Sequence, residues 1–333
     1  MDETNNGRRL IFIGGSPRSG TTLVQNMLDS HPLILGGPEF LHLPDVIDLR
    51  RKLHTSISLE WIDIICSRDD VDRYVISLIE NLFLPLADKH QCEFYSEKTP
   101  ENILVFSELM ALFPEAHFIQ VIRDPRGIVS SMQQVKKRAI DKGLDPPSYC
   151  ANISKSIAYM KKCFDAGFAA SKNTRGKMLT VVYEQLLMNP ERETKQICSF
   201  LEIEWNDLML FPGDKEHLGA QAITAKSNKI WYDSKTYYRN PDHQNIQKWK
   251  SKLTLGQQLK IALTFRGNKD LMQCGYDFSI DELTRENYVL SRCYFFYLWL
   301  ARAIYRFLSV VIRKIPGLSL IRNGLLAVTR LLG

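Results

Sequence analysis

The segment IFIGGSPRSGTTLVQNML, residues 11–28, begins with an apolar run and then changes to glycines and hydroxyl side chains. The apolar run predicts a buried strand, the glycines a tight turn, and the residues from Thr21 onward a helix. From Gly15 the segment fits the phosphate-loop pattern GxxxxGK[ST] except at Thr21, where the pattern has lysine. Backbone N–H groups in such a turn hold a phosphate whatever the side chains are, and Arg18 adds a positive charge. The segment therefore predicts a phosphate site for a ligand with a shorter anionic chain than a nucleoside triphosphate.

Three further apolar runs follow this first one, and helical stretches alternate with them. Runs of this length with helices between them predict a parallel sheet that is covered on both faces. We therefore expect an α/β fold, a phosphate-loop-type parallel sheet flanked by helices, over residues 1–280. Residues 212–245 are polar and rich in turn formers, which predicts a loop that becomes ordered when a ligand binds. The predicted strands are residues 94–98, 116–124 and 177–184, and the predicted helices are residues 102–113, 127–138 and 191–201.

A second polar cluster stands at the end of the apolar run 116–124, in the sequence VIRDPRGIVSSM. Arg123 and Asp124 come at the predicted strand end, where ligands gather in open α/β sheets, and Ser131 lies in the following helix. Guanidinium matches the geometry of phosphate, so Arg123 and Ser131 predict a second phosphate-binding position. Two other interpretations remain open. Asp124 caps the helix and takes part in a strand-end ion pair, or it is the magnesium ligand of a nucleotide-binding strand.

Composition and charge exclude some classes of protein. The chain has 333 residues and a net charge of +6, which does not by itself indicate a nucleic-acid partner. Its seven cysteines are scattered and form no CxxC pair, so neither a disulfide framework nor a zinc site is predicted, and no metal is expected. Residues 1–10 are polar and contain no apolar core of signal-peptide length, which predicts a cytoplasmic protein.

The basic excess lies in the C-terminal segment 281–333, which from residue 287 onward has seven basic and no acidic residues. Residues 288–312 contain no uncharged apolar stretch long enough to span a bilayer. On a helix, four arginines of this segment fall within a sector of about 80°, and the other positions are aromatic or aliphatic. This pattern predicts an amphipathic helical tail on a membrane surface, and the alternative is a helix packed on the domain or on a second subunit of a homodimer. The four residues are Arg292, Arg302, Arg306 and Arg313.

Taken together, the motifs resemble those of the sulfotransferases that use 3′-phosphoadenosine 5′-phosphosulfate (PAPS), and most closely the tyrosylprotein-sulfotransferase-like branch. The matching stretches are FIGGSPRSGTTLVQNMLDSHP, EKTP, FIQVIRDPRGIVSSM, VVYEQLLMNP and IQKW, in the family's order, between residues 12 and 249. The resemblance implies that PAPS is the sulfuryl donor, that 3′,5′-diphosphoadenosine is the product and that no metal takes part. A single 5′-phosphosulfate also accounts for the missing lysine of the phosphate loop.

The same resemblance assigns roles to residues of this sequence. Glu39 matches the position of the family's catalytic base, and Lys98, with Arg18, matches a cation near the transferred sulfuryl group. A positioned carboxylate takes the proton of an acceptor hydroxyl, and fixed cations stabilise charge on a leaving phosphate. The residues implied to hold the donor are Arg18, Ser19, Gly20, Thr21 and Thr22 at the 5′-phosphosulfate, Arg123 and Ser131 at the 3′-phosphate, and Tyr183, Ser227 and Arg239 elsewhere on the donor.

Leu41 departs from the family pattern, because members specific for peptide tyrosine carry an arginine two residues after the base. The acceptor therefore stays open among lipid, glycan, small-molecule and protein-tyrosine hydroxyls. Two other functions compete with the sulfotransferase: a phosphate-loop nucleotide kinase in which Arg18 replaces the lysine, and a catalytically silent, nucleotide-binding membrane protein. Activity that depends on magnesium would indicate the kinase, and binding of 3′,5′-diphosphoadenosine without turnover would indicate the silent protein. We expect a cytoplasmic enzyme that associates peripherally with a membrane.

Overall fold

A computed structural model of the chain describes residues 7–172, 177–219, 230–231 and 237–278, together with five positions between 296 and 304. The chain divides into two compact units, Met1–Trp249 and Lys250–Gly333. Within the predicted tail, 281–333, the described residues are Phe296, Trp299, Leu300, Ala303 and Ile304, all of them helical.

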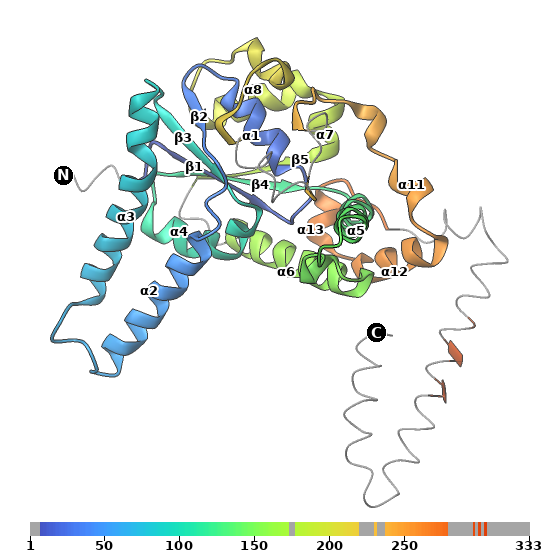
Figure 1. Ribbon diagram of the computed structural model, residues 1–333, viewed down its shortest axis with the longest axis horizontal. Helices are drawn as coiled ribbons and strands as arrows, with labels where there is room; N and C mark the ends of the chain where they lie inside the picture. The colour runs from blue at the N-terminus through green and yellow to red at the C-terminus, as the bar shows by residue number, and fades with distance from the viewer. Residues whose placement is uncertain are drawn as a thin grey trace, which may run out of the picture. The chain divides into compact units, whose positions relative to one another are not determined.

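The first unit is built on a sheet of five parallel strands in the order β2-β3-β1-β4-β5 (Figure 1). From β1 the chain forms β2 and β3 on one side of the sheet and then crosses to β4 and β5 on the other side. The switch point, where ligands bind in open α/β folds, therefore falls at β1. The strands are β1 (Leu10–Gly15), β2 (Ile34–Gly36), β3 (Phe94–Lys98), β4 (His117–Ile122) and β5 (Lys177–Val182).

The strand register aligns the carboxyl ends of the central strands. Ile13 of β1 pairs with Lys98 of β3, and Gly15 pairs with Val121 of β4. The turn after β1, the last residue of β3 and the first residues after β4 therefore lie along the same edge of the sheet.

Helices cover both faces of the sheet, because alternate residues of each central strand point to opposite sides. Leu10, Phe12 and Phe118 belong to a buried cluster with α3, α4 and α6, and Phe12 stacks on Phe118 with 5.3 Å between ring centroids. Ile11, Ile13 and Ile119 belong to a second cluster with α1, α7 and α8. These helices are α3 (Arg68–Lys89), α4 (Phe106–Leu112) and α6 (Ile153–Lys172) on the first face and α1 (Thr21–Asp29), α7 (Tyr183–Met188) and α8 (Pro190–Leu201) on the second.

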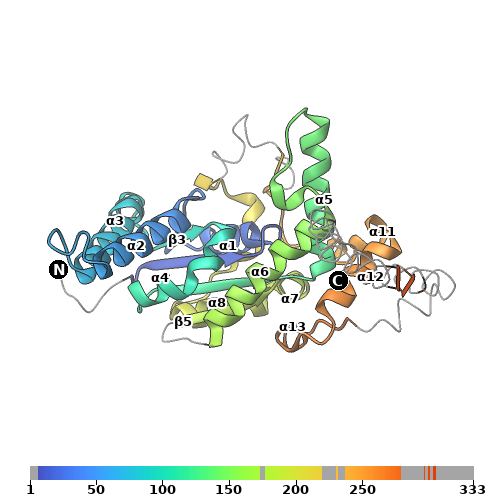
Figure 2. The ribbon, with the colours of Figure 1, turned by 90° about the horizontal axis from the view of Figure 1, so that it is seen from below.

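Two more helices complete the first unit. α2 (Leu43–Ser58) pairs with α3 in a hairpin that extends beyond the sheet, and α5 (Pro125–Asp141) follows β4 and packs on α6 (Figures 1 and 2). The second unit contains α12 (Leu255–Phe265) and α13 (Lys269–Gln273), and α11 (Trp249–Lys252) lies at the boundary. The short 3₁₀ turns are η1 (Pro100–Val105), η2 (Ser148–Cys150), η3 (Asp207–Leu210), η4 (Pro212–Asp214) and η6 (His243–Asn245).

Several predicted element ends differ from the structure. α5 begins at Pro125, because the Asp124 side chain accepts a hydrogen bond from the N–H of Arg126 and starts the helix there. The last predicted strand ends at Val182, since Tyr183 already begins α7. The helix predicted from residue 102 opens as the 3₁₀ turn η1 and becomes α-helical at Phe106. A strand was expected just before the turn Gly36–Gly37–Pro38, and β2 lies there, whereas α2, α3 and α6 were not predicted from the sequence.

The C-terminal tail is described in part. None of the helices in the described part of the chain is long and apolar enough to cross a membrane. The rings of Phe296 and Trp299 are 61% and 63% exposed and stack at 5.9 Å between centroids. Arg292, Arg302 and Arg306 lie outside the described residues, as does Arg313.

Candidate active site

The turn between β1 and α1 has the backbone of a phosphate-binding loop. Arg18 and Gly20 both have positive φ, 74° and 107°, and the N–H of Ser19 donates to the carbonyl of Ser16 at 2.9 Å. A Cβ on Gly20 would lie 2.3 Å from a carbon of the Tyr183 ring, so only glycine closes the turn against α7. The turn leads into the N-terminus of α1, which favours a negatively charged ligand.

Two buried polar atoms beside this turn have no hydrogen-bond partner in the described structure. They are the Oγ of Ser19, a residue with 0% exposure, and the Nε of Arg123. Buried polar groups are nearly always hydrogen-bonded, so a pair of unpartnered donors calls for an acceptor that comes from a ligand. The oxygens of a phosphate or sulfate group are such acceptors, and the residues present therefore fit the anionic groups of PAPS.

The structure brings four of the sequence-predicted donor residues together. An Nη of Arg123 donates to the carbonyl oxygen of Arg18 at 3.1 Å, and the Arg123 guanidinium lies over the Tyr183 ring, 4.4 Å from its centroid. The Nε of Arg18 donates to the Oγ of Ser131 at 3.1 Å. The two predicted phosphate positions are therefore adjacent, and Arg18 contacts residues of both.

Asp124 has the geometry of a helix cap. Its Oδ1 accepts from the backbone N–H of Arg126 at 2.8 Å, and both of its carboxylate oxygens accept from the Arg126 guanidinium. Its own N–H donates to Glu184 at 3.1 Å. This favours the interpretation of Asp124 as a cap in a strand-end ion pair over that of a magnesium ligand.

Glu39 and Lys98 form an ion pair at the same edge of the sheet. Lys98 is the last residue of β3 and its side chain is 1% exposed, whereas the Glu39 side chain is 28% exposed. A buried ammonium requires a partner of opposite charge, and Glu39 supplies it. Two of the three residues predicted for catalysis, Glu39 and Lys98, are therefore in direct contact, with one oxygen of Glu39 bound to the lysine and the carboxylate partly exposed to solvent.

The loop that carries Glu39 is held by α1 and β3. The amide of Gln25 donates to the carbonyl of Gly37 at 3.0 Å, and Asp29 accepts from the N–H of Gly36 at 2.7 Å. Gln25 and Asp29 are four residues apart and therefore share one face of α1. A Cβ on Gly37 would lie 1.7 Å from the hydroxyl of Tyr95, so the loop can approach β3 this closely only with glycine at this position.

Glu97 is a buried carboxylate beside the predicted base that was not singled out from the sequence. Its carboxylate is fully buried and accepts from the N–H of Phe40 at 2.9 Å, from the Thr99 hydroxyl at 2.7 Å and from the Asn102 amide. Burial raises the pKa of Glu97 to about 7, against the hydrogen bonds that lower it. Because Phe40 follows Glu39 directly, Glu97 fixes the backbone beside the predicted base. The signal was present in SEKTP, where a glutamate stands inside a run predicted as a buried strand.

Two predicted donor residues, Ser227 and Arg239, remain to be placed. Ser227 lies outside the described residues. Arg239 is described and exposed, and its neighbour Asn240 accepts from the N–H of Gly213 at 2.8 Å. In the part of the chain that the structure describes, Arg239 makes no hydrogen bond or ion pair with the phosphate loop.

Residues 10–207, which span all five strands, match the sequence model of the sulfotransferase family. The chain belongs to the sulfotransferase family. The family and its enzymatic class, predicted from the motifs, are thereby confirmed.

Relatives in this family include protein-tyrosine sulfotransferases. Protein-tyrosine sulfotransferase 1 of Danio rerio is 28% identical over 279 residues, covering 82% of this chain and 74% of its own length. The protein-tyrosine sulfotransferase of Drosophila melanogaster is 32% identical over 60% of this chain, and protein-tyrosine sulfotransferase 1 of Homo sapiens is 33% identical over 60%. The chain spans 39% and 53% of the length of these two relatives.

Solved structures confirm the predicted fold class. The sulfotransferase domain from the Synechococcus PCC 7002 olefin synthase superimposes with a TM-score of 0.52 at 19% identity, covering 76% of this chain and 90% of that domain. The sulfotransferase domain from the curacin biosynthetic pathway gives a TM-score of 0.51 at 18% identity, with 73% and 91% covered.

We predict that Glu97→Leu lowers turnover about tenfold or more, whereas Glu97→Gln stays within a few-fold of the wild type. Leucine leaves the N–H of Phe40 without an acceptor and releases the Glu39 loop. Glutamine keeps an acceptor for that N–H, and the Asn102 amide can turn to offer its Oδ1, which has no partner in the described structure. Steady-state rates, with the affinity for 3′,5′-diphosphoadenosine measured in parallel, check this. Wild-type turnover in Glu97→Leu would show that Glu97 has no positioning role.

Proposed function

We propose that this chain transfers the sulfuryl group of PAPS to an acceptor hydroxyl. The observation that carries the proposal is that the phosphate loop, the Arg123–Ser131 position and the Glu39–Lys98 pair all emerge at one edge of the sheet. This places cations for two anionic groups beside a carboxylate that faces solvent. A nucleotide with a 5′-phosphosulfate and a 3′-phosphate has the charges that this arrangement would bind.

Donor binding is assigned to the residues around the loop. The N–H groups at the start of α1, with Ser19, Thr21 and Thr22, would hold the 5′-phosphosulfate. Arg123 and Ser131 would hold the 3′-phosphate, with Arg18 between the two groups. The remaining assignments are Gly20, which permits the turn, Tyr183, whose ring supports Arg123, and Ser227 and Arg239, which rest on the motif resemblance.

When bound, the donor supplies the sulfuryl group and leaves as 3′,5′-diphosphoadenosine. Glu39 accepts the proton of the acceptor hydroxyl as its oxygen forms a bond to sulfur. The bond between sulfur and the 5′-phosphate oxygen breaks, and Lys98 and Arg18 stabilise the charge that develops on this oxygen. The products are a sulfate ester and 3′,5′-diphosphoadenosine, with the proton on Glu39. These residues need no metal for this step.

The acceptor is a molecule that reaches Glu39 from solvent. The relatives are named for protein tyrosine, and a tyrosine hydroxyl is the first acceptor class to test. Leu41, two residues from Glu39, is 59% exposed and gives this entrance an apolar side chain where the motif resemblance has arginine. An acidic peptide would therefore lack one cationic contact at this position. An acceptor with apolar groups around its hydroxyl is favoured.

Radiolabelled PAPS tests the function directly. The full chain is incubated in EDTA with four acceptors: a tyrosine in an acidic peptide, a tyrosine in a neutral apolar peptide, a glycolipid and a simple phenol. Transfer of label to at least one acceptor is expected. Binding of 3′,5′-diphosphoadenosine without any transfer would instead favour the silent protein, and magnesium-dependent transfer of phosphate from a nucleoside triphosphate would favour the kinase.

We also propose that the C-terminal segment binds a membrane surface. Its described apolar side chains Phe296, Trp299 and Ile304 are 50–63% exposed. The segment is also the part of the sequence with a basic excess, and each lysine or arginine near an anionic bilayer contributes about 1 kcal/mol. Exposed aromatic rings with neighbouring basic residues suit the interface of an anionic bilayer.

Arg123→Ala is expected to weaken binding of 3′,5′-diphosphoadenosine about tenfold or more, and binding of adenosine 5′-phosphosulfate much less. The second ligand lacks the 3′-phosphate that Arg123 would contact. Calorimetry with both ligands measures the difference, and Arg9→Ala, which removes an arginine paired with Asp88, is the matched control. Equal losses for the two ligands would contradict the assignment.

Glu39→Gln is expected to lower turnover roughly 10²-fold or more while donor affinity stays nearly unchanged, because the change removes a proton acceptor and little volume. Single-turnover rates with radiolabelled PAPS measure it. Glu80→Gln, a partly buried carboxylate that accepts from the N–H of Gly7, serves as control. If Glu39→Gln sulfated its acceptor at the wild-type rate, another residue would have to be the base.

For the tail, we predict that the full chain sediments with vesicles containing phosphatidylserine. The double variant Phe296→Ser and Trp299→Ser should have a vesicle partition coefficient that is lower roughly tenfold or more, because two aromatic side chains no longer enter the interface. Trp61→Ser, which changes a 72% exposed tryptophan of the first unit, is the control. Unchanged sedimentation of the double variant would leave the segment as a packing element.

A further inference from the structure

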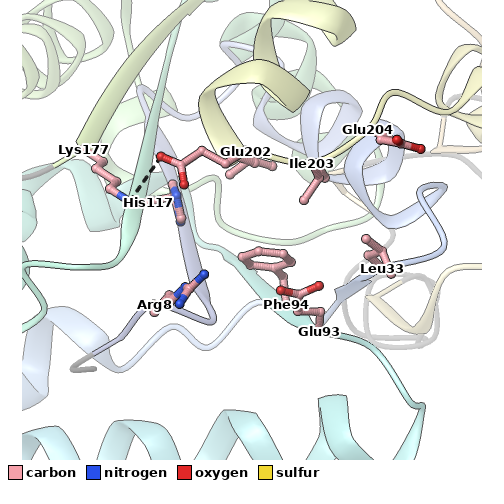
Figure 3. Close-up of a pocket in the computed structure, with 10 residues that line it drawn as sticks. Arg8, Leu33, Glu93, Phe94, His117, Lys177, Glu202, Ile203 and Glu204 are labelled. Carbon is pink, nitrogen blue, oxygen red and sulfur yellow. Dashed lines mark ion pairs between the residues drawn. The ribbon is translucent and has the colours of Figure 1, made fainter. Parts of the chain in front are cut away.

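A pocket of about 280 Å³ opens at the amino ends of the strands, at the edge opposite to the candidate active site (Figure 3). Phe94 begins β3, His117 begins β4 and Lys177 begins β5, and all three line it. The same strands β3 and β4 end at the candidate active site, so strands of five and six residues separate the two places. At about 3.3 Å per residue this is roughly 15–20 Å.

His117 is the residue that marks the pocket as a binding site. It is 3% exposed, and neither ring nitrogen has a hydrogen-bond partner in the described structure. Its ring contacts Phe94 and Phe200 edge-on, at 6.0 and 5.4 Å between centroids. Burial, with a smaller effect of Lys177, lowers the pKa of His117 to about 4, so the ring is neutral at neutral pH. A neutral imidazole has one donor and one acceptor, and here both lack partners.

Three charged side chains, those of Arg8, Lys177 and Glu202, lie around His117 (Figure 3). Arg8 and Lys177 lie on the same side of the Phe94 ring as His117, and their side chains point toward it (Figure 3). Lys177 is 3.8 Å from Glu202, a loose pair whose glutamate side chain is 72% exposed. Glu93 and Glu204 line the other side, beyond the Phe94 ring.

We propose that this pocket binds a small organic carboxylate, with its anionic end at Arg8, Lys177 and His117. The apolar body of the ligand lies against Phe94 and its apolar neighbours Leu33 and Ile203. Arg8 and Lys177 donate to the carboxylate, and the N–H of His117 gains an acceptor. An inorganic anion would make no contact with the apolar side of the pocket. A dicarboxylate would place its second negative charge near Glu93, which would repel it. The site is independent of the proposed transfer reaction, since none of its residues belongs to the donor site.

Benzoate is the probe, with benzamide as its neutral isostere. The full chain is titrated with each while the imidazole signals of its histidines are followed by NMR, and His117→Phe identifies the signals of His117. Benzoate should shift the His117 signals saturably, and benzamide should bind roughly tenfold more weakly or not at all. Equal binding of the two, or no saturable shift, overturns the proposal.

Charge variants then test where the carboxylate lies. Arg8→Gln and Lys177→Gln should each lower the affinity for benzoate roughly two- to tenfold, which is the range for charged contacts at partly exposed sites. Lys52→Gln is the matched control, because Lys52 is likewise paired with one carboxylate, that of Asp48, and lies on α2 away from the pocket. Terephthalate should bind more weakly than benzoate. If Lys52→Gln lowers the affinity for benzoate as much as Lys177→Gln does, the loss comes from the change in net charge and the proposed site is wrong.

Discussion

The ion pair between Lys98 and Glu39 is the interaction on which the candidate site depends. Lys98 has a side chain that is 1% exposed at the end of a central strand, and a charge in such a place costs several kcal/mol unless it is paired. Glu39 therefore has to reach the end of β3, although 59 residues separate the two in sequence. The close approach of residues 36–40 to β3 follows from this requirement. Gly37 fits under the Tyr95 hydroxyl, and Glu97 accepts from the N–H of Phe40.

Helix α1 joins the two halves of the site. Its N-terminus continues the phosphate loop, and Gln25 and Asp29 farther along the same helix hold the loop of Glu39. Asp29 also pairs with the buried side chain of His217. This pair fixes residues 212–219, which begin the polar segment 212–245, to this helix. A displacement of α1 would therefore move the donor loop and the predicted base together. In the proposed reaction this one element would set the distance between the leaving group and the predicted base, as in-line transfer requires.

The sequence carried enough local information for the phosphate loop and the sheet. Glycine spacing in GGSPRSGTT specifies a turn with positive φ, and continuous apolar runs specify strands buried on both faces. Arg123 was placed at the site because ligands gather at strand ends in open α/β sheets, and Ser131 because it lies in the helix that follows the same strand. The contact of Glu39 with Lys98 could not be derived from local pattern, since β2 has three residues and gives no periodic signal. The surroundings of Glu97 and His117 could not be predicted for a related reason. The hydrogen-bond partners of a polar residue inside an apolar run, or their absence, are known only once the chain has folded.

In the proposed function, one edge of the sheet holds the donor so that Lys98 faces the leaving oxygen and Glu39 faces the acceptor. A crystal structure of the chain with 3′,5′-diphosphoadenosine tests this most directly. We expect the 5′-phosphate on the N–H groups of the loop, hydrogen-bonded to the Oγ of Ser19 and within reach of the Nζ of Lys98. We expect the 3′-phosphate on Arg123 and Ser131. A 5′-phosphate bound away from Lys98, with the Glu39–Lys98 pair left outside the nucleotide site, would contradict it.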